Sequence, residues 1–162
     1  MATITFKNGD EYIAKINKLS REFRESVAGP AIYEAAGMVA DAVDAKLAAV
    51  PTDERWGMAG AVKAGPREAE ARSVYNALGI AKMQDDNGFI NVKIGFDGYS
   101  PLKSLRWPNG QPNQMLARSI ERGTSFMAAN PFVKPAVAST RGAALKAIKN
   151  IMDNEISKIM KG

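Results

Sequence analysis

Two prolines enclose a phenylalanine at the start of the longest helical pattern in this 162-residue chain. The residues are Pro131, Phe132 and Pro135, and Asn130 precedes them. Proline fixes φ and lacks a backbone N–H, so it fits the first turn of a helix and breaks a helix further in. We therefore expect a helix that opens at Pro131 with Asn130 as its cap. This rigid corner is expected to direct Phe132 into the core.

The segment after this corner has the periodicity of an amphipathic helix. Large apolar residues recur every three or four positions, which is typical of a helix that packs through one stripe. The stripe consists of Leu145, Ile148, Met152, Ile156 and Ile159.

A second long helix is predicted between Pro30 and Pro51. Gly29-Pro30 is expected to separate it from an earlier helix, and Pro51 is expected to end it. Its apolar stripe consists of Ile32, Ala36, Val39, Val43 and Leu47. Small residues elsewhere on this helix would let another element approach closely, in this chain or in a neighbouring subunit; they are Gly37, Ala40, Ala42, Ala45 and Ala48.

The clearest β signal lies between residues 80 and 96. The segments Ile80–Gln84 and Phe89–Phe96 flank the sequence DDNG, and Asn87-Gly88 is a preferred pair for a two-residue hairpin turn. In the second run apolar residues alternate with polar or small ones, so one face is expected to be buried and the other wet. The apolar positions are Ile90, Val92, Ile94 and Phe96.

The remaining segments complete an α+β pattern. We expect a short strand over Thr3–Phe6, a helix from Asp10 to about Ser26, and short helices near 67–78 and 113–122. Gly79 is expected to cap the first of these short helices at its C-terminus. The segments near 52–65 and 97–112 are interpreted as mobile loops. The prediction is one domain, 1–162, with a small antiparallel sheet and a central hairpin packed against two long helices, one N-terminal and one C-terminal.

The composition leaves little room for catalysis. The chain has no cysteine and no histidine, which excludes thiol and histidine chemistry and the usual zinc sites. The adjacent acids Asp53-Glu54 and Asp85-Asp86 point apart, and no glycine cluster has the spacing of a phosphate-binding loop. We expect no enzyme, no catalytic residue, no cofactor and no metal. A small-molecule enzyme is the least supported class, with only loop tryptophans and scattered carboxylates in its favour.

Both tryptophans lie in the predicted loops and follow an arginine. Arg55 precedes Trp56, and Arg106 precedes Trp107. Tryptophan and arginine are enriched at binding hot spots, so these four residues are candidates for a subunit interface. The alternative is that each ring folds back on the core of its own domain. Stacking on single-stranded bases is a further, weaker alternative.

The positive charge is concentrated near the C-terminus. The net charge is +5, and the segment from residue 134 onward holds six basic and two acidic residues, a balance of +4. A candidate basic face on the last helix consists of Arg141, Lys146, Lys149 and Lys158. Such a face is typical either of a helix that contacts nucleic acid or an acidic partner, or simply of a solvated surface. Asp153 and Glu155 interrupt it.

Nothing in the sequence indicates a membrane protein or a secreted one. No apolar run approaches the roughly 18 residues of a membrane span, and the first residues lack the pattern of a secretory signal. We expect the chain to be made, and to remain, in the cytoplasm of the cell that produces it.

The stretch IERGTSFMAANPFVKPAV resembles the motif of the tail-completion, or head–tail joining, proteins of long-tailed bacteriophages. In that family a Glu-Phe-Gly-Thr segment precedes a Pro-Phe corner and a long terminal helix. Arg122 stands where the family has an aromatic residue. Val50-Pro51-Thr52 and NVKIGF also fall in the family's order of elements. The matching residues are Glu121, Gly123, Thr124, Pro131, Phe132, Pro135 and Ala136.

The resemblance implies a structural protein of the virion neck. It would assemble in the host cytoplasm as a homo-oligomeric ring between the head connector or stopper and the tail-terminator or tail-tube proteins. Six subunits are expected by analogy, with twelve as the alternative, and genome DNA would pass through the lumen only transiently. The competing hypothesis is a nucleic-acid-binding protein or assembly factor that uses the basic C-terminal helix.

Overall fold

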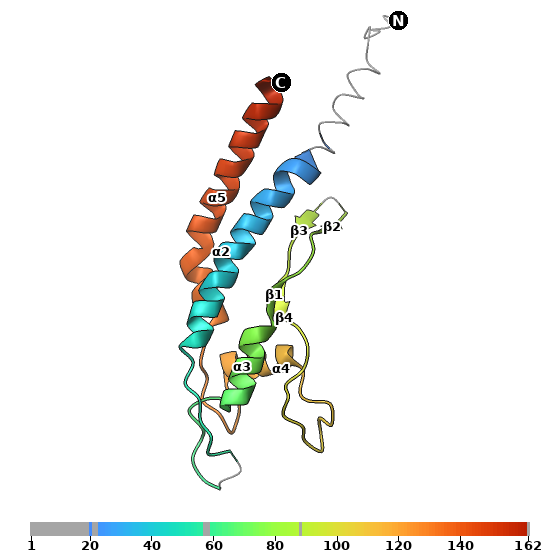
Figure 1. The fold of residues 1–162 in the computed structure, drawn as a ribbon. Helices are drawn as coiled ribbons and strands as arrows, with labels where there is room; N and C mark the ends of the chain where they lie inside the picture. Colours follow the sequence, from blue (N-terminus) through green and yellow to red (C-terminus); the bar gives the residue numbers. More distant parts are fainter. Residues whose placement is uncertain (1–19, 21–22, 57–58, 88, 162) are drawn as a thin grey trace, which may run out of the picture.

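The computed structural model describes residues 20, 23–56, 59–87 and 89–161 of the chain (Figure 1). The predicted strand over Thr3–Phe6 lies outside these residues, as does most of the helix predicted from Asp10. The described part is α+β, with α-helices and small antiparallel two-stranded sheets, which confirms the predicted class.

Two long helices form the largest layer of the molecule. They run side by side along its length, with the short helices and the loops at one end and the C-terminus at the other (Figure 1). In chain order the helical elements are a π-helical segment η1 (Phe23–Ala28) and the α-helices α2 (Gly29–Ala48), α3 (Glu68–Ala77), α4 (Asn113–Arg122) and α5 (Val133–Lys161). In the described part of the chain, no helix has the length and apolarity needed to cross a membrane.

The Gly29-Pro30 pair does not separate two helices, so that prediction is wrong. Ala28 has helical dihedrals, φ −69° and ψ −39°, and η1 continues directly into α2. Pro30 lies in the first turn of α2 as predicted. Because it cannot donate to the carbonyl one turn earlier, it marks a change from wide π-type turns to α-helical turns rather than a break. α2 then ends at Ala48, shortly before Pro51.

The predicted hairpin exists as one long ribbon in two paired sections. β1 (Leu78–Ile80) pairs antiparallel with β4 (Ile94–Phe96), and β2 (Gln84–Asp86) pairs antiparallel with β3 (Phe89–Asn91). Residues 81–83 on one side face only 92–93 on the other, so one extra residue interrupts the ladder as in a β-bulge. Asn87 has φ +56°, as the predicted two-residue turn requires.

Gly79 does not cap α3, contrary to the prediction. The helix ends at Ala77, Leu78 already has extended dihedrals, and Gly79 pairs with Gly95 inside the β1–β4 section. The helix runs into the strand without a turn, so no left-handed residue is needed between them.

The core lies where the short helices meet the base of α5. Phe132 has no exposed surface and meets Phe96 edge-on, with ring centroids 5.9 Å apart, which confirms the predicted direction of its side chain. The other buried members of this cluster are Val43, Leu47, Val74, Leu116, Ala117, Ile120, Met127 and Ala136.

The predicted apolar stripe of α5 is confirmed only in part, because Ile148 and Met152 are half-buried but two other members are exposed. Leu145 is 58% exposed and Ile156 is 40% exposed, whereas Ala136 and Ala144 are buried. α2 also buries alanines, at positions 31, 35 and 36. Small side chains let the two helices approach closely, and the larger residues of α5 are left along the edge of the contact. The side chain of Ile159, the last residue of that stripe, is outside the described part.

Candidate assembly interface

The residues of the Pro-Phe corner are held together by Glu121. Its carboxylate accepts hydrogen bonds from the backbone N–H groups of Phe132 at 2.7 Å, Val133 at 2.8 Å and Lys134 at 3.0 Å. These are among the groups that the start of a helix leaves without an intrahelical partner. Glu121, from the preceding helix, is therefore the cap of α5.

The cap predicted at Asn130 is consequently wrong. The Asn130 side-chain amide donates instead to the carbonyls of Ala64 at 2.8 Å and Ala128 at 3.2 Å. A carboxylate competes better than an amide for this position, because its charge-assisted bonds are stronger and it complements the positive end of the helix dipole.

The electrostatics of Glu121 follow from this geometry. Partial burial raises the pKa of its carboxyl group, but the three backbone hydrogen bonds and the nearby Lys134 outweigh burial. The net result is a pKa below the ordinary value, so Glu121 is ionised where it caps the helix.

Gly123 and Thr124 shape the turn between α4 and α5. Gly123 has φ +72° and ψ 175°, a region open essentially only to glycine, and a Cβ there would lie 2.7 Å from the nitrogen of Ala129. The Thr124 hydroxyl accepts hydrogen bonds from the N–H groups of Phe126 and Met127 at 3.2 and 3.1 Å. Pro135 lies in the first turn of α5, as predicted. The motif residues therefore build a structural corner.

The loop over 52–65 is joined to this corner. Lys63 and Met127 form a parallel bridge, with Lys63 N–H donating to Phe126 O and Ala128 N–H donating to Lys63 O, both at 2.8 Å. Asp53 is buried and accepts hydrogen bonds from the Arg55 guanidinium at 2.7 and 2.9 Å and from Ala64 N–H at 3.0 Å. The Arg55 side chain, followed by these N–H donors, lowers the pKa of Asp53 well below its usual range.

The structure separates the roles of Arg55 and Trp56. Arg55 binds Asp53, while Trp56 is half-buried against the core with its indole N–H 3.3 Å from Gly65 O. The Arg67 guanidinium lies 5.5 Å from the centroid of the Trp56 ring. Trp56 thus folds back on its own domain, the alternative that the sequence left open.

The second pair, Arg106 and Trp107, lies at an outer loop. Ser104 and Trp107 exchange two backbone hydrogen bonds, at 3.0 and 3.1 Å, so Leu105 and Arg106 form the tip of a tight turn. Arg106 lies 5.8 Å from the half-buried Trp107 ring. Leu105 at the tip is fully exposed, with a relative accessibility of 106%.

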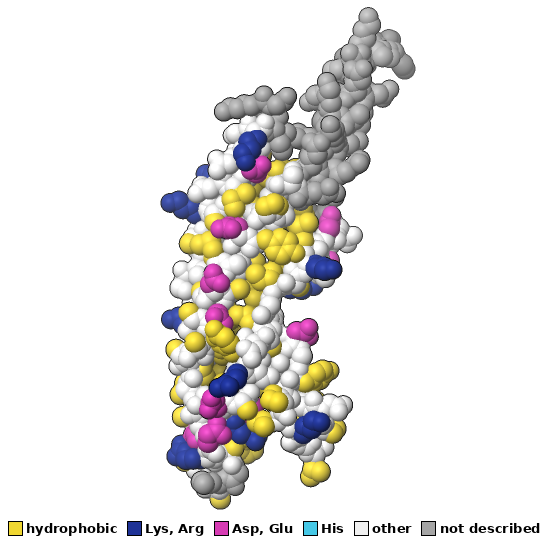
Figure 2. Space-filling view, in the orientation of Figure 1, with side chains coloured by type: hydrophobic (Ala, Val, Ile, Leu, Met, Phe, Trp, Pro, Cys, Tyr) yellow, Lys and Arg dark blue, Asp and Glu magenta, His cyan; other side chains and the backbone are white. Residues whose placement is uncertain are grey.

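Large apolar side chains are exposed on the loops at this end of the molecule. Val62 and Phe126 occupy the outward side of the bridge whose inward side carries Lys63 and Met127, because successive side chains of extended segments alternate. The loops lie at the end opposite the C-terminus (Figure 1), and hydrophobic side chains reach solvent there (Figure 2). We call this the loop-end surface; it consists of Val62, Tyr99, Leu105 and Phe126, with exposures of 55, 64, 106 and 68%.

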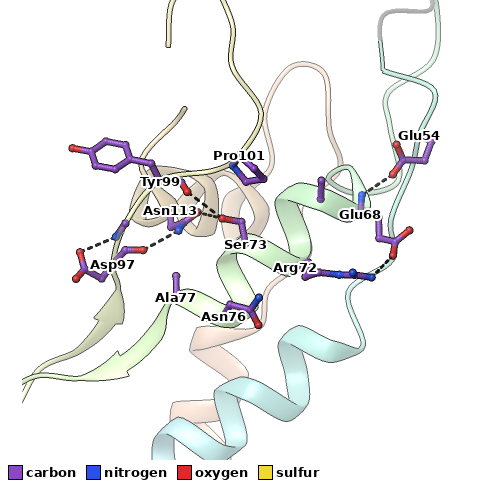
Figure 3. A pocket seen from close by; sticks show the side chains of 12 residues that line it. Glu54, Glu68, Arg72, Ser73, Asn76, Ala77, Asp97, Tyr99, Pro101 and Asn113 are labelled. Carbon is purple, nitrogen blue, oxygen red and sulfur yellow. Dashed lines mark hydrogen bonds and ion pairs between the residues drawn. The ribbon is translucent and has the colours of Figure 1, made fainter. Parts of the chain in front are cut away.

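A pocket of about 650 Å³, lined by both polar and apolar residues, lies between α3, α4 and the loop after β4 (Figure 3). Ser73 Oγ donates to Asn113 Oδ1 at 2.8 Å, and Asn113 Nδ2 donates to Asp97 O at 2.8 Å. Arg72 pairs with Glu68 at 2.7 Å. These groups satisfy one another and fix the relative positions of the elements, and none forms a nucleophile–base pair.

Among the described residues there is no group of three or more acidic, histidine or cysteine side chains placed to hold a metal ion.

The basic residues of α5 do not form one compact face. All four are exposed, but at about 100° per residue Lys149 and Lys146 lie roughly 80° and 140° from Arg141, and Lys158 lies on its other side. Lys158 forms an ion pair with Glu155. On the face shown in Figure 2, Lys and Arg side chains are scattered rather than gathered.

Several residues that organise these surfaces were not singled out from the sequence. The sequence pattern singles out Trp107 and not its neighbour Leu105, and it presents Asp53 only as half of an acidic pair. The two-residue spacing of Asp53 and Arg55 is the sequence signal that could have indicated their contact.

No protein-family model, no curated protein and no solved structure matches this chain.

Proposed function

We propose that this chain is a structural protein of the bacteriophage neck, a subunit of a ring that joins the head connector to the tail tube. The observation that carries the proposal is the loop-end surface, where four large apolar side chains from three loops are exposed at one end of an elongated molecule. Large apolar side chains exposed on loops are candidates for protein–protein contacts. The resemblance of the corner segment to head–tail joining proteins supplies the setting.

In this setting the loop-end surface contacts a neighbouring component, either the connector or stopper or the tail-terminator or tail-tube protein. The corner formed by Glu121, Gly123 and Thr124 holds two of the three loops in place. The ring has six subunits by analogy, assembles in the host cytoplasm, and surrounds genome DNA in transit. The scattered basic side chains suit a lumen of this kind, because strong phosphate binding would hinder passage.

The test is immunogold labelling of particles of the phage that encodes the chain, with an antibody to the protein. We expect one focus of gold at each head–tail junction. Absence of label from intact particles, in a lysate that contains abundant soluble protein, would contradict the proposal. A salt titration of DNA binding would then test the nucleic-acid alternative, since phosphate contacts give a steep loss of affinity with salt.

A further inference from the structure

An open groove of about 820 Å³ runs along the base of the hairpin. It is lined by β1, β4, α4 and the first turn of α5. Ile80, Ile94 and Phe96 contribute apolar surface to it, and Ile80 is 37% exposed. The apolar face of the two-stranded ribbon is therefore partly exposed, because no further layer of secondary structure packs over it among the described residues.

The rim of this groove is basic. Lys93, Arg118, Arg122 and Lys134 line it, against the acids Asp97 and Glu121, which leaves a balance of +2. Lys93 Nζ donates to Gln84 Oε1 on β2 at 2.8 Å, so the two arginines of α4 and Lys134 are the main basic groups of the rim. The Glu121 carboxylate is directed at the N–H groups of α5. The exposed guanidinium groups of Arg118 and Arg122, one turn apart on α4, have no hydrogen bond or ion pair with any other described residue.

The other end of the same hairpin has the opposite charge. Residues 84–91 contain Asp85 and Asp86 and no basic residue, a balance of −2. Both acids are exposed on β2, and the tip projects away from α3 and α4 along the side of α2 (Figure 1). The hairpin therefore carries an acidic tip and, at its base, one wall of a basic-rimmed groove.

We propose that the acidic hairpin tip of one copy docks into the basic-rimmed groove of the next copy. Asp85 and Asp86 pair there with Arg118 and Arg122, because arginine binds carboxylates through paired, charge-assisted hydrogen bonds. The tip cannot enter its own groove. At about 3.3 Å per residue, Asp85 lies roughly 16 Å further along the ribbon than Ile80, which lines the groove.

A contact between two different surfaces of the same chain is heterologous, and it closes into a ring when the rotation between copies allows. The inference rests on the proposed function, for which it supplies the lateral contact between subunits. It leaves the loop-end surface for contact with other components. Because the pairing is electrostatic and near the surface, high salt weakens it.

The absence of native cysteine makes disulfide trapping a direct test. The double variant Asp86→Cys/Arg118→Cys is oxidised mildly, both as purified protein and in phage particles. We expect a ladder of covalent multimers in at least one of the two preparations. The matched control, Asp86→Cys/Arg141→Cys, replaces another exposed basic residue outside the groove, and should give at least tenfold less multimer. Circular dichroism before oxidation verifies that both variants fold.

Charge exchange provides an independent readout. Asp85→Lys/Asp86→Lys should reduce incorporation into particles at least tenfold, and adding Arg118→Glu/Arg122→Glu should restore most of it. The contact would be overturned if Asp86→Cys/Arg118→Cys formed no multimers in either preparation. It would also be overturned if Asp86→Cys/Arg141→Cys formed as many multimers as that variant. A photoreactive label on Arg118→Cys that captures a different virion protein instead of residues 84–91 would overturn it as well.

The outcomes separate the two proposals. Gold at the neck without groove cross-links would overturn this contact and leave the neck assignment intact. Groove cross-links in purified protein, together with unlabelled particles, would support the contact and contradict the neck assignment.

Discussion

The corner between α4 and α5 and the long α2–α5 contact stabilise the molecule in different ways. At the corner single groups have specific partners: one carboxylate caps three N–H groups, one glycine adopts dihedrals closed to other residues, and Phe132 is completely buried. Along the helix pair, alanines such as Ala35 and Ala144 are buried, and large residues at the edge such as Leu145 remain exposed. The corner depends on the identity of each residue, whereas the helix pair depends mainly on small size and tolerates change at its edges.

The largest expected difference is between Phe132→Ala and Leu145→Ala. Removing a fully buried aromatic side chain costs about 3–5 kcal/mol, whereas Leu145 is 58% exposed and its truncation should change stability by less than about 0.5 kcal/mol. Urea denaturation of both variants measures the difference. Equal losses would show that the helix pair is as specific as the corner.

Two glycine substitutions should change stability in opposite directions. Gly123→Ala forces alanine into a strained conformation and against Ala129, at a cost of about 1–3 kcal/mol. Gly142 lies inside α5, and a Cβ there would meet nothing within 4 Å. Gly142→Ala should therefore stabilise the protein by about 0.5–1 kcal/mol. Thermal melts of the two variants show whether each substitution raises or lowers the stability. If both lowered it, another part of the protein would have to pack against α5 at Gly142.

Glu121→Gln keeps the shape of the cap but removes its charge, and should cost about 1 kcal/mol at neutral pH. Glu155→Gln, which breaks an exposed ion pair on α5, is the control and should cost less.

Glu121→Gln should also change the pH dependence of the free energy of unfolding. The pKa of Glu121 in the folded state is below its ordinary value of 4.5, so its contribution is complete above that pH and is lost as pH falls through the lowered pKa. Asp53 acts in the same direction. Between pH 5 and 3, roughly the window that these directions define, the wild type should lose more stability than Glu121→Gln. Parallel curves would show that Glu121 does not titrate with folding.

The smallest effect on stability, but a large one on assembly, is expected for Leu105→Ser. Leu105 is fully exposed, so the free energy of unfolding should change by less than about 0.5 kcal/mol. Incorporation into particles should fall if the loop-end surface makes the contact that we propose. Trp107→Ala is the companion variant, and normal assembly by both would remove the loop over 97–112 from the interface.

Local signals predicted the elements of this fold better than their packing. The Asn87-Gly88 turn, α4 and the direction of Phe132 are fixed by short-range rules of turn chemistry, periodicity and proline geometry. The buried face of α5 is predicted only in part by such rules, because the choice between Ala144 and Leu145 as the inward residue depends on how closely α2 approaches. The cap at Glu121 is also not predictable from local signals, since the carboxylate comes from a different helix, eleven residues before Phe132.

The interface candidates show the same limit. An arginine beside a tryptophan indicates binding potential, but only the fold decides that Trp56 covers the core while Leu105 occupies a loop tip. The groove on the hairpin could not be read from the sequence, because its charges come from separate strands and helices that lie together only after folding.

The pairing of α2 with α5 has a consequence for synthesis. α5 begins 85 positions after α2 ends, so at about 5–20 residues per second a ribosome needs roughly 4–17 s merely to reach the first residue of the partner helix. Throughout that interval the alanine face of α2 lacks the helix that covers it in the finished molecule. A chain whose translation stops before α5 would display this face to its neighbours on the polysome, and aggregates rather than incomplete rings would be its expected product.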